Sequence, residues 1–253
     1  MFTPEGRSQL RSDLLQYAAN DARIKGAAIT GSAAIDGEDR WSDIDLAFGV
    51  AEAAQLPSVL SDWTAFMYEE HRAVHHVDVK SAAWIYRVFL LASTMQVDLA
   101  FVPDTEFRAL APTFRLIFGK ANEPRHIPSA PPSDIIGLGW LYALHARSCI
   151  ARRKLWQAEY MISGVRDHAL ALACIRHGLP GAHGRGIDQL PREVAAKFEA
   201  SLVIRLDSDE VSRAFRVAVS GLLGEIQIAD QELARRLEET LTRLSDTLAE
   251  TPA

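Results

Sequence analysis

Cysteine is scarce in this chain, and long apolar runs are missing. The two cysteines, Cys149 and Cys174, both fall in apolar segments with helical spacing. We expect reduced thiols of a cytoplasmic protein, and a disulfide between them is the less favoured alternative. No apolar run approaches the about 20 residues that span a bilayer, and the start, 1–6, lacks the basic and apolar regions of a signal peptide. The sequence therefore predicts no export and no membrane partner.

Basic residues are also in short supply. Lys and Arg number 27 against 33 Asp and Glu, which gives a formal net charge of -6. Polynucleotide binding normally relies on basic surface that neutralises phosphates, so we expect no nucleic-acid partner. An acidic protein suits a cationic small molecule better.

Prolines are concentrated in one place, because four of the eleven fall between Asn122 and Pro132. Proline opposes both helix and central strand, so we expect a domain boundary there, with domains at 1–125 and 126–253. Helical and strand patterns are mixed before the boundary, and only helical patterns follow it. The predicted fold class is α+β: a small mixed β-sheet with flanking helices, followed by a C-terminal helical bundle.

Apolar spacing and helix-end signals locate the expected elements. In the first domain we expect helices over 4–20 and 53–70, and strands over 27–29, 41–48, 74–79, 84–91 and 95–101. In the second domain we expect helices over 133–150, 155–177, 191–202, 207–228 and 230–250, with Ser133 and Asp207 as helix starts.

The most informative motif begins at a Gly-Ser pair. Gly31 and Ser32 end an apolar run, where glycine lets a phosphate approach the backbone and serine offers a hydroxyl. Asp43 and Asp45 follow after a short loop and share one face of an expected strand whose other face is apolar. Asp98 takes the same place in the later alternating segment. If the two strands are neighbours, the three carboxylates converge.

Three converging carboxylates repel one another and lose hydration unless a cation neutralises them. Hard oxygen ligands of this kind suit magnesium. Asp78, on the alternating run 74–79, is the alternative third ligand. The adjacent His75 and His76 do not predict a zinc site, because neighbouring strand residues face opposite ways and no cysteine lies nearby.

With these residues the chain resembles the nucleotidyltransferases of the DNA polymerase beta superfamily. Their pattern is an apolar strand ending in Gly-Ser, an apolar-Asp-apolar-Asp strand and a third acidic residue on a later strand, here Gly31, Ser32, Asp43, Asp45 and Asp98. The segment 33–35, Ala-Ala-Ile, lacks the basic residue that some members place there. The helical part resembles, more weakly, the second domain of the kanamycin- and streptomycin-modifying enzymes.

The resemblance implies a magnesium-dependent enzyme. Asp43, Asp45 and Asp98 would bind two Mg²⁺ ions, and Gly31 and Ser32 would contact the nucleotide, which is ATP or another nucleoside triphosphate. The reaction would transfer a nucleoside monophosphate, with AMP expected first, to a hydroxyl of a small-molecule acceptor resembling an aminoglycoside, and release pyrophosphate.

The helical domain offers further candidates. Glu159 is the position most similar to the glutamate that acts as general base in kanamycin-type enzymes, a comparison of location rather than of motif. Arg166 and Asp167 are candidate substrate contacts on the same helix. The glycine-rich stretch 180–188, which carries His183 and Arg185, matches neither a P-loop nor a dinucleotide fingerprint, so a simple connection is the favoured interpretation.

Other functions remain open from the sequence. The same chemistry could modify a protein, as in nucleotidyltransferases of toxin-antitoxin systems, or a nucleic-acid end, which the acidic charge opposes. A catalytically silent nucleotide-binding regulatory module would keep the fold without the reaction. The sequence is compatible with a monomer or a homodimer.

Overall fold

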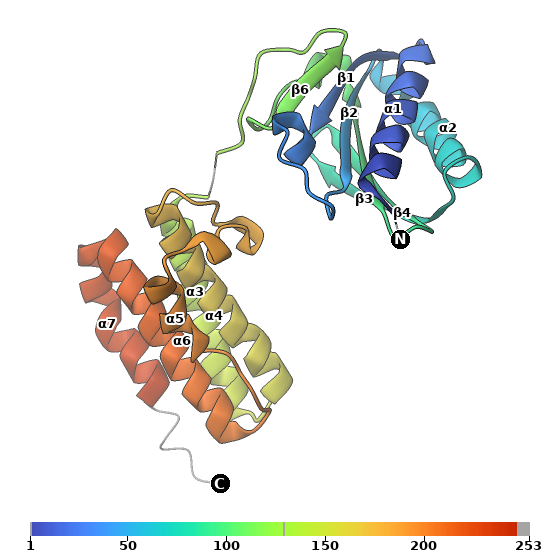
Figure 1. Ribbon diagram of the computed structural model, residues 1–253. Helices are drawn as coiled ribbons and strands as arrows, with labels where there is room; N and C mark the ends of the chain where they lie inside the picture. The colour runs from blue at the N-terminus through green and yellow to red at the C-terminus, as the bar shows by residue number, and fades with distance from the viewer. Residues whose placement is uncertain (1, 129, 247–253) are drawn as a thin grey trace. The chain divides into compact units, whose positions relative to one another are not determined.

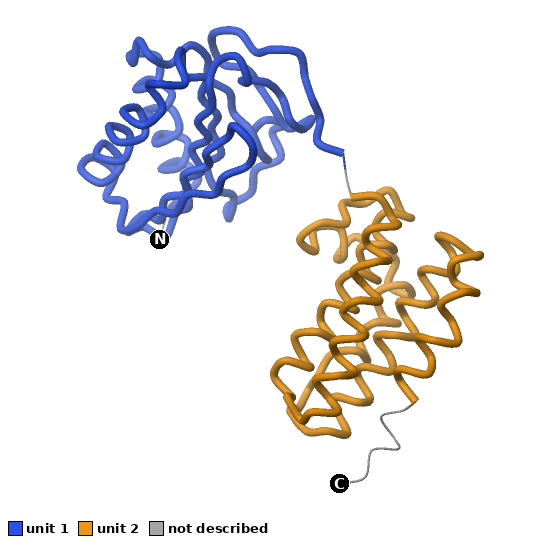
Figure 2. Tube along the Cα trace, turned by 180° about the vertical axis from the view of Figure 1, so that it is seen from behind, with its two compact units in different colours: residues 1–128 blue, residues 129–253 orange. Residues whose placement is uncertain are grey.

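The computed structural model describes residues 2–128 and 130–246. The chain divides into two compact units, residues 1–128 and 129–253 (Figures 1 and 2). The division lies within the proline-containing segment, three residues beyond the boundary expected at 125. Among the described residues, no helix is both long enough and apolar enough to cross a bilayer.

The first unit is a six-stranded mixed sheet with helices. In chain order its elements are α1 (Pro4–Asn20), β1 (Ile24–Thr30), η1 (Gly31–Ile35), β2 (Ile44–Val50), η2 (Ala53–Gln55), α2 (Leu56–Glu69), β3 (Ala73–Ser81), β4 (Trp84–Leu91), β5 (Gln96–Pro103), η3 (Asp104–Glu106) and β6 (Phe114–Phe118). The strand order is β3-β4-β5-β2-β1-β6. The β2–β5 pair is parallel, and the other neighbouring pairs are antiparallel.

The two faces of this sheet differ. Alternate residues of β2 and β5, among them Leu46, Phe48 and Leu99, are buried in one core with residues of α1 and α2 such as Leu14 and Trp63. The opposite face, called here the open face, carries the other alternate residues and a smaller apolar cluster: Ala28, Ala47, Trp84, Ala100, Val102 and Phe107. The alternation predicted for segments 41–48 and 95–101 is confirmed.

The sequence interpretation missed β6. This five-residue strand pairs antiparallel with β1 at the edge of the sheet. Its sequence, Phe-Arg-Leu-Ile-Phe, does not alternate cleanly, and Leu116 and Ile117 are exposed. Gly119, with a φ of +81°, follows the strand, and this apolar run before a glycine was the available signal.

The second unit is a helical bundle, as predicted. Its elements are α3 (Pro132–Ala151), α4 (Leu155–Arg176), η4 (Ala182–Gly184), η5 (Ile187–Gln189), α5 (Arg192–Glu199), α6 (Ser208–Ala229) and α7 (Gln231–Asp246). Pro131, not Ser133, occupies the N-cap of α3. The end expected near Glu250 for the last helix lies outside the described residues. Cys149 and Cys174 are free thiols in the core of this bundle.

The start of α6 is fixed by a small polar network. The Asp207 carboxylate accepts a hydrogen bond from the Glu210 backbone N–H at 2.9 Å, which confirms the predicted cap. The Glu210 carboxylate accepts hydrogen bonds from Arg213 Nε and Nη2, at 2.9 and 2.7 Å, and from the Ile204 N–H at 3.0 Å. These bonds, those of Arg213 above all, lower the pKa of Glu210 to about 2.

This network predicts acid sensitivity in the bundle. The pKa of Glu210 is lower in the folded protein than its ordinary value of 4.5, so its contribution to stability is complete above that pH and is lost as pH falls toward about 2. We expect Glu210→Gln to flatten the dependence of the unfolding midpoint on pH in that window. Urea titrations of the full chain between about pH 2 and 5 measure it, with the exposed Glu239→Gln as control. Superimposable pH profiles for Glu210→Gln and wild type would contradict this role.

Candidate active site

The parallel pairing of β2 and β5 brings the predicted aspartates together. Asp45 lies directly opposite Asp98 in the register, and Asp43 immediately precedes β2 on the same open face. One carboxylate oxygen from each of the three lies within 4.8 Å of the other two. The sequence predicted that the three carboxylates converge if the two strands are neighbours. The strands are neighbours, and the carboxylates converge.

The site is half-buried, which affects its electrostatics. Gln96 Nε2 donates to Asp43 Oδ2 at 3.2 Å and to Asp98 Oδ1 at 3.1 Å. Burial raises the pKa of Asp98 to about 6; the hydrogen bond from Gln96 opposes this rise, and the negative charge of Asp43 adds to it. Sequence reasoning missed Gln96, although its place two residues before Asp98 on one strand face was a usable signal.

Gly31 shapes the site from the end of β1. Its φ is +64°, in the left-handed region that favours glycine. A Cβ added there would lie 2.9 Å from Asp45 Cγ and would overlap Asp45 Oδ2. The turn thus packs directly on the Asp45 carboxylate, and Ser32 follows it, half-buried, as the second residue of η1.

The alternative third ligand is engaged elsewhere. Asp78 lies on the edge strand β3 and accepts hydrogen bonds from Arg87 Nε and Nη2, both at 2.7 Å. These bonds lower the pKa of Asp78. Of the two candidates it is Asp98, not Asp78, that joins Asp43 and Asp45. His76 Nδ1 is hydrogen-bonded to the Tyr68 hydroxyl at 3.0 Å.

The helical unit carries the other predicted residues on α4. Glu159 is half-buried, and its Oε1 accepts a hydrogen bond from Ser163 Oγ at 2.8 Å. Arg166 Nε lies 3.5 Å from Asp167 Oδ1, and the Asp167 side chain is 62% exposed. These residues lie in the second unit, and the aspartate cluster lies in the first.

Asp167 also lines a cavity of about 580 Å³ within the helical unit. Apolar side chains such as Ile135, Leu138 and Ile175 supply much of its lining, together with His168 and His183. His168 Nδ1 is 2.7 Å from the Gly164 carbonyl, which only accepts hydrogen bonds, so Nδ1 donates. The glycine-rich stretch contributes His183 to this lining, and its interpretation as a simple connection stays a prediction.

The aspartate cluster fits a magnesium ion by the chemistry of its donors. All three groups offer carboxylate oxygens, the ligand type that magnesium prefers. The amide of Gln96 bonds two of the three carboxylates, but it is neutral and leaves their charges in place. A divalent cation would offset the repulsion among them.

No protein-family model matches the chain. No curated protein matches it either. Among solved structures, the chain is similar to the crystal structure of an aminoglycoside 6-adenyltransferase from Bacillus subtilis, at 12% identity and a TM-score of 0.43, covering 98% of this chain and 99% of that one.

Proposed function

We propose that this protein is a magnesium-dependent nucleotidyltransferase that transfers a nucleoside monophosphate, AMP as the first expectation, to a hydroxyl of a small molecule. The observation that carries the proposal is the cluster of Asp43, Asp45 and Asp98 on one sheet face, directly beside the Gly31 turn. Three half-buried carboxylates at this separation are costly unless they bind a cation.

Each residue has a defined task in this proposal. Asp43, Asp45 and Asp98 would hold two Mg²⁺ ions, and such ions would supply positive charge to offset that of the phosphates. Gly31 leaves room for the phosphates, and Ser32 donates a hydrogen bond to them. The acceptor oxygen forms a bond to the α-phosphorus as the bond from that phosphorus to the bridging oxygen breaks, and pyrophosphate leaves. The acceptor proton passes to Glu159.

The acceptor is proposed to be a cationic, hydroxyl-bearing small molecule. Asp167 supports this assignment, because it places a carboxylate on a cavity of about 580 Å³, which is within the about 300–1,000 Å³ typical of small-molecule sites. Arg166, with its Nε 3.5 Å from Asp167 Oδ1, is the second proposed substrate contact on this helix. The net charge of -6 also favours a cationic acceptor over a nucleic acid.

Radiolabel transfer tests the proposal. Purified protein is incubated with Mg²⁺, each α-labelled nucleoside triphosphate, and either an aminoglycoside and lincosamide panel or a protein extract. Label on a small molecule supports the proposal. Label on a protein supports the toxin-antitoxin alternative, and no transfer with nucleotide still bound supports a silent module.

The role of Glu159 gives a separate prediction. Glu159→Gln removes a proton acceptor but keeps the shape of the side chain, so nucleotide binding should be unchanged. Turnover should fall by roughly 10²–10⁴-fold, the usual contribution of positioned proton transfer. Steady-state kinetics and nucleotide-binding titrations, with the exposed Glu193→Gln as control, measure the two effects. Full turnover in Glu159→Gln would leave Glu159 as a helix-face residue.

A further inference from the structure

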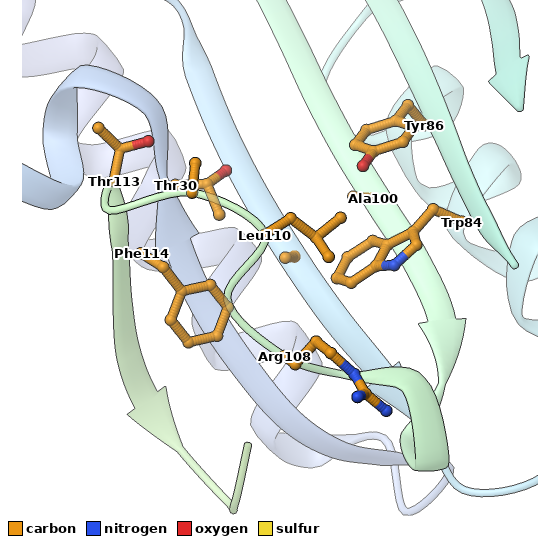
Figure 3. A pocket seen from close by; sticks show the side chains of 10 residues that line it. Thr30, Trp84, Tyr86, Ala100, Arg108, Leu110, Thr113 and Phe114 are labelled. Carbon is orange, nitrogen blue, oxygen red and sulfur yellow. The ribbon is translucent and has the colours of Figure 1, made fainter. Parts of the chain in front are cut away.

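The open face of the sheet contains a small cavity that the reaction scheme above does not use. Its volume is about 160 Å³, and residues of β1, β2, β4, β5, β6 and the segment before β6 line it (Figure 3). This size is below the about 300–1,000 Å³ of drug-sized sites, so the cavity suits one ring system rather than a whole ligand.

The cavity adjoins the aspartate cluster. Ala47 and Ala100, which line it, come two residues after Asp45 and Asp98 and therefore lie on the same face, about 7 Å further along each strand. Thr30, another lining residue, immediately precedes Gly31. A ligand held by its phosphates at the aspartates would need to extend only this short distance to enter the cavity.

Aromatic side chains form one wall. Trp84 and Tyr86 are two residues apart on β4 and therefore share one face of the sheet. Their ring centroids lie 6.0 Å apart, with an angle of 21° between the ring planes. Leu110 lies close to Trp84 in Figure 3. Ala47 of β2 and Ala100 of β5 line the cavity with small side chains, which leave room for a ligand. Flat faces and small apolar groups of this kind favour a planar ring, which stacks without needing many hydrogen bonds.

The segment that covers the cavity is anchored to the sheet. Phe107 is fully buried, and Cβ atoms at Gly26 or Gly49 would come within 3 Å of its ring, so the two glycines make room for it. Asn122 Nδ2 donates to the carbonyl oxygens of Asp104 and Phe107 at 2.7 and 3.0 Å. The cavity wall is therefore formed before any ligand arrives, which lowers the entropy cost of binding.

Arg108 is the charged side chain in the cavity lining. Its guanidinium donates to the Thr105 carbonyl at 2.8 Å and lies 3.4 Å from the Glu106 carboxylate, which fixes its position in the lining. The guanidinium has only hydrogen-bond donors, so it matches acceptor atoms rather than ammonium groups. It suits a ring that carries oxygen or nitrogen acceptors beside an anionic phosphate chain.

We propose that this cavity is the subsite for the nucleobase of the nucleoside triphosphate, with the base stacked on Trp84 and Tyr86 and an acceptor atom of the base facing Arg108. This inference rests on the proposed function, since it takes the phosphates to be bound at Asp43, Asp45 and Asp98. It assigns the base to the sheet unit and leaves the cavity at Asp167 for the acceptor.

Binding of two probes tests the subsite. Calorimetry in Mg²⁺ compares a nucleoside triphosphate with inorganic tripolyphosphate, which lacks the base. Tyr86→Leu should raise the Kd of the nucleotide about 5- to 150-fold, the range expected for loss of one base–aromatic stack, and leave tripolyphosphate unchanged. Leu110→Trp fills the cavity from the loop side without altering the sheet and should do the same. Tyr68→Leu, on α2 across the sheet, is the matched control.

The outcomes separate this inference from the proposed function. If wild-type protein binds neither probe in Mg²⁺, the proposed function fails. If wild type binds tripolyphosphate as tightly as the nucleotide, or if the two cavity variants leave nucleotide binding intact, the base lies elsewhere and this inference is wrong. Equal weakening of both probes also overturns it, and so does an effect confined to the acceptor's KM.

Discussion

Asp98→Asn should abolish nucleotidyl transfer and yet stabilise the metal-free protein. Transfer should fall by at least about 1,000-fold, because a bound metal supplies several kcal/mol of transition-state stabilisation and each 1.36 kcal/mol is tenfold in rate. Without metal the change removes one of three charges within 4.8 Å, so the melting temperature in EDTA at about pH 8 should rise by roughly 2–4 °C, the shift that about 1 kcal/mol produces in a chain of this size.

Asp78→Asn is the matched control for this prediction. It makes the same chemical change two strands away but breaks the ion pair with Arg87, so it should lower stability slightly and leave transfer intact. Calorimetric Mg²⁺ titration with nucleotide and differential scanning in EDTA measure both effects. If Asp78→Asn abolishes transfer and Asp98→Asn does not, the third ligand has been assigned to the wrong strand.

Gly31→Ala should be nearly as damaging to the reaction, although the methyl group adds no charge. The new Cβ would meet Asp45 Oδ2, so the carboxylate must move away from Asp43 and Asp98. We expect at least about a 100-fold loss of transfer, because misplacing a reacting group by about 1 Å is sufficient for that. The left-handed φ of +64° should cost roughly a further 1–2 kcal/mol of folding stability.

Gly37→Ala provides the comparison within the same loop. A Cβ at Gly37 would meet its nearest neighbours at 3.6 Å, an ordinary contact, so transfer and stability should stay close to wild type. Magnesium-dependent nucleotide binding of both variants measures the effect on the site, and urea unfolding measures the effect on folding stability. Wild-type transfer in Gly31→Ala would show that the turn does not position Asp45.

Local pattern predicted the parts of the site but not their assembly. Alternation along each strand placed Asp43, Asp45 and Asp98 on faces opposite the apolar residues, because side chains on a strand alternate strictly. The sequence contains no local signal that β5 pairs with β2, since that pairing joins distant segments. Asp78 remained an alternative for this reason, and the Arg87 ion pair that engages it depends on cross-strand register.

Features built from several segments were beyond prediction for the same reason. The cavity on the open face draws its lining from five strands and a loop, and no single stretch encodes it. Gln96, at the start of β5, donates a hydrogen bond to Asp43, which lies just before β2 and far away in the sequence. The sequence predicted that Glu159 lies on a helix, and the structure confirms this. Its proposed role depends on contacts with the substrate, which the spacing of residues along a helix does not predict.

The parallel junction of β2 and β5 also affects how the site arises during folding. β1 and β2 pair antiparallel with each other, and β3, β4 and β5 form a meander of neighbours, so each group can form from contacts that are near in the chain. Only the pairing of the two groups sets Asp45 against Asp98. Because this pairing joins segments that are far apart in the chain, we expect it to form after the local pairs, and the mutual repulsion of these carboxylates to arise with it.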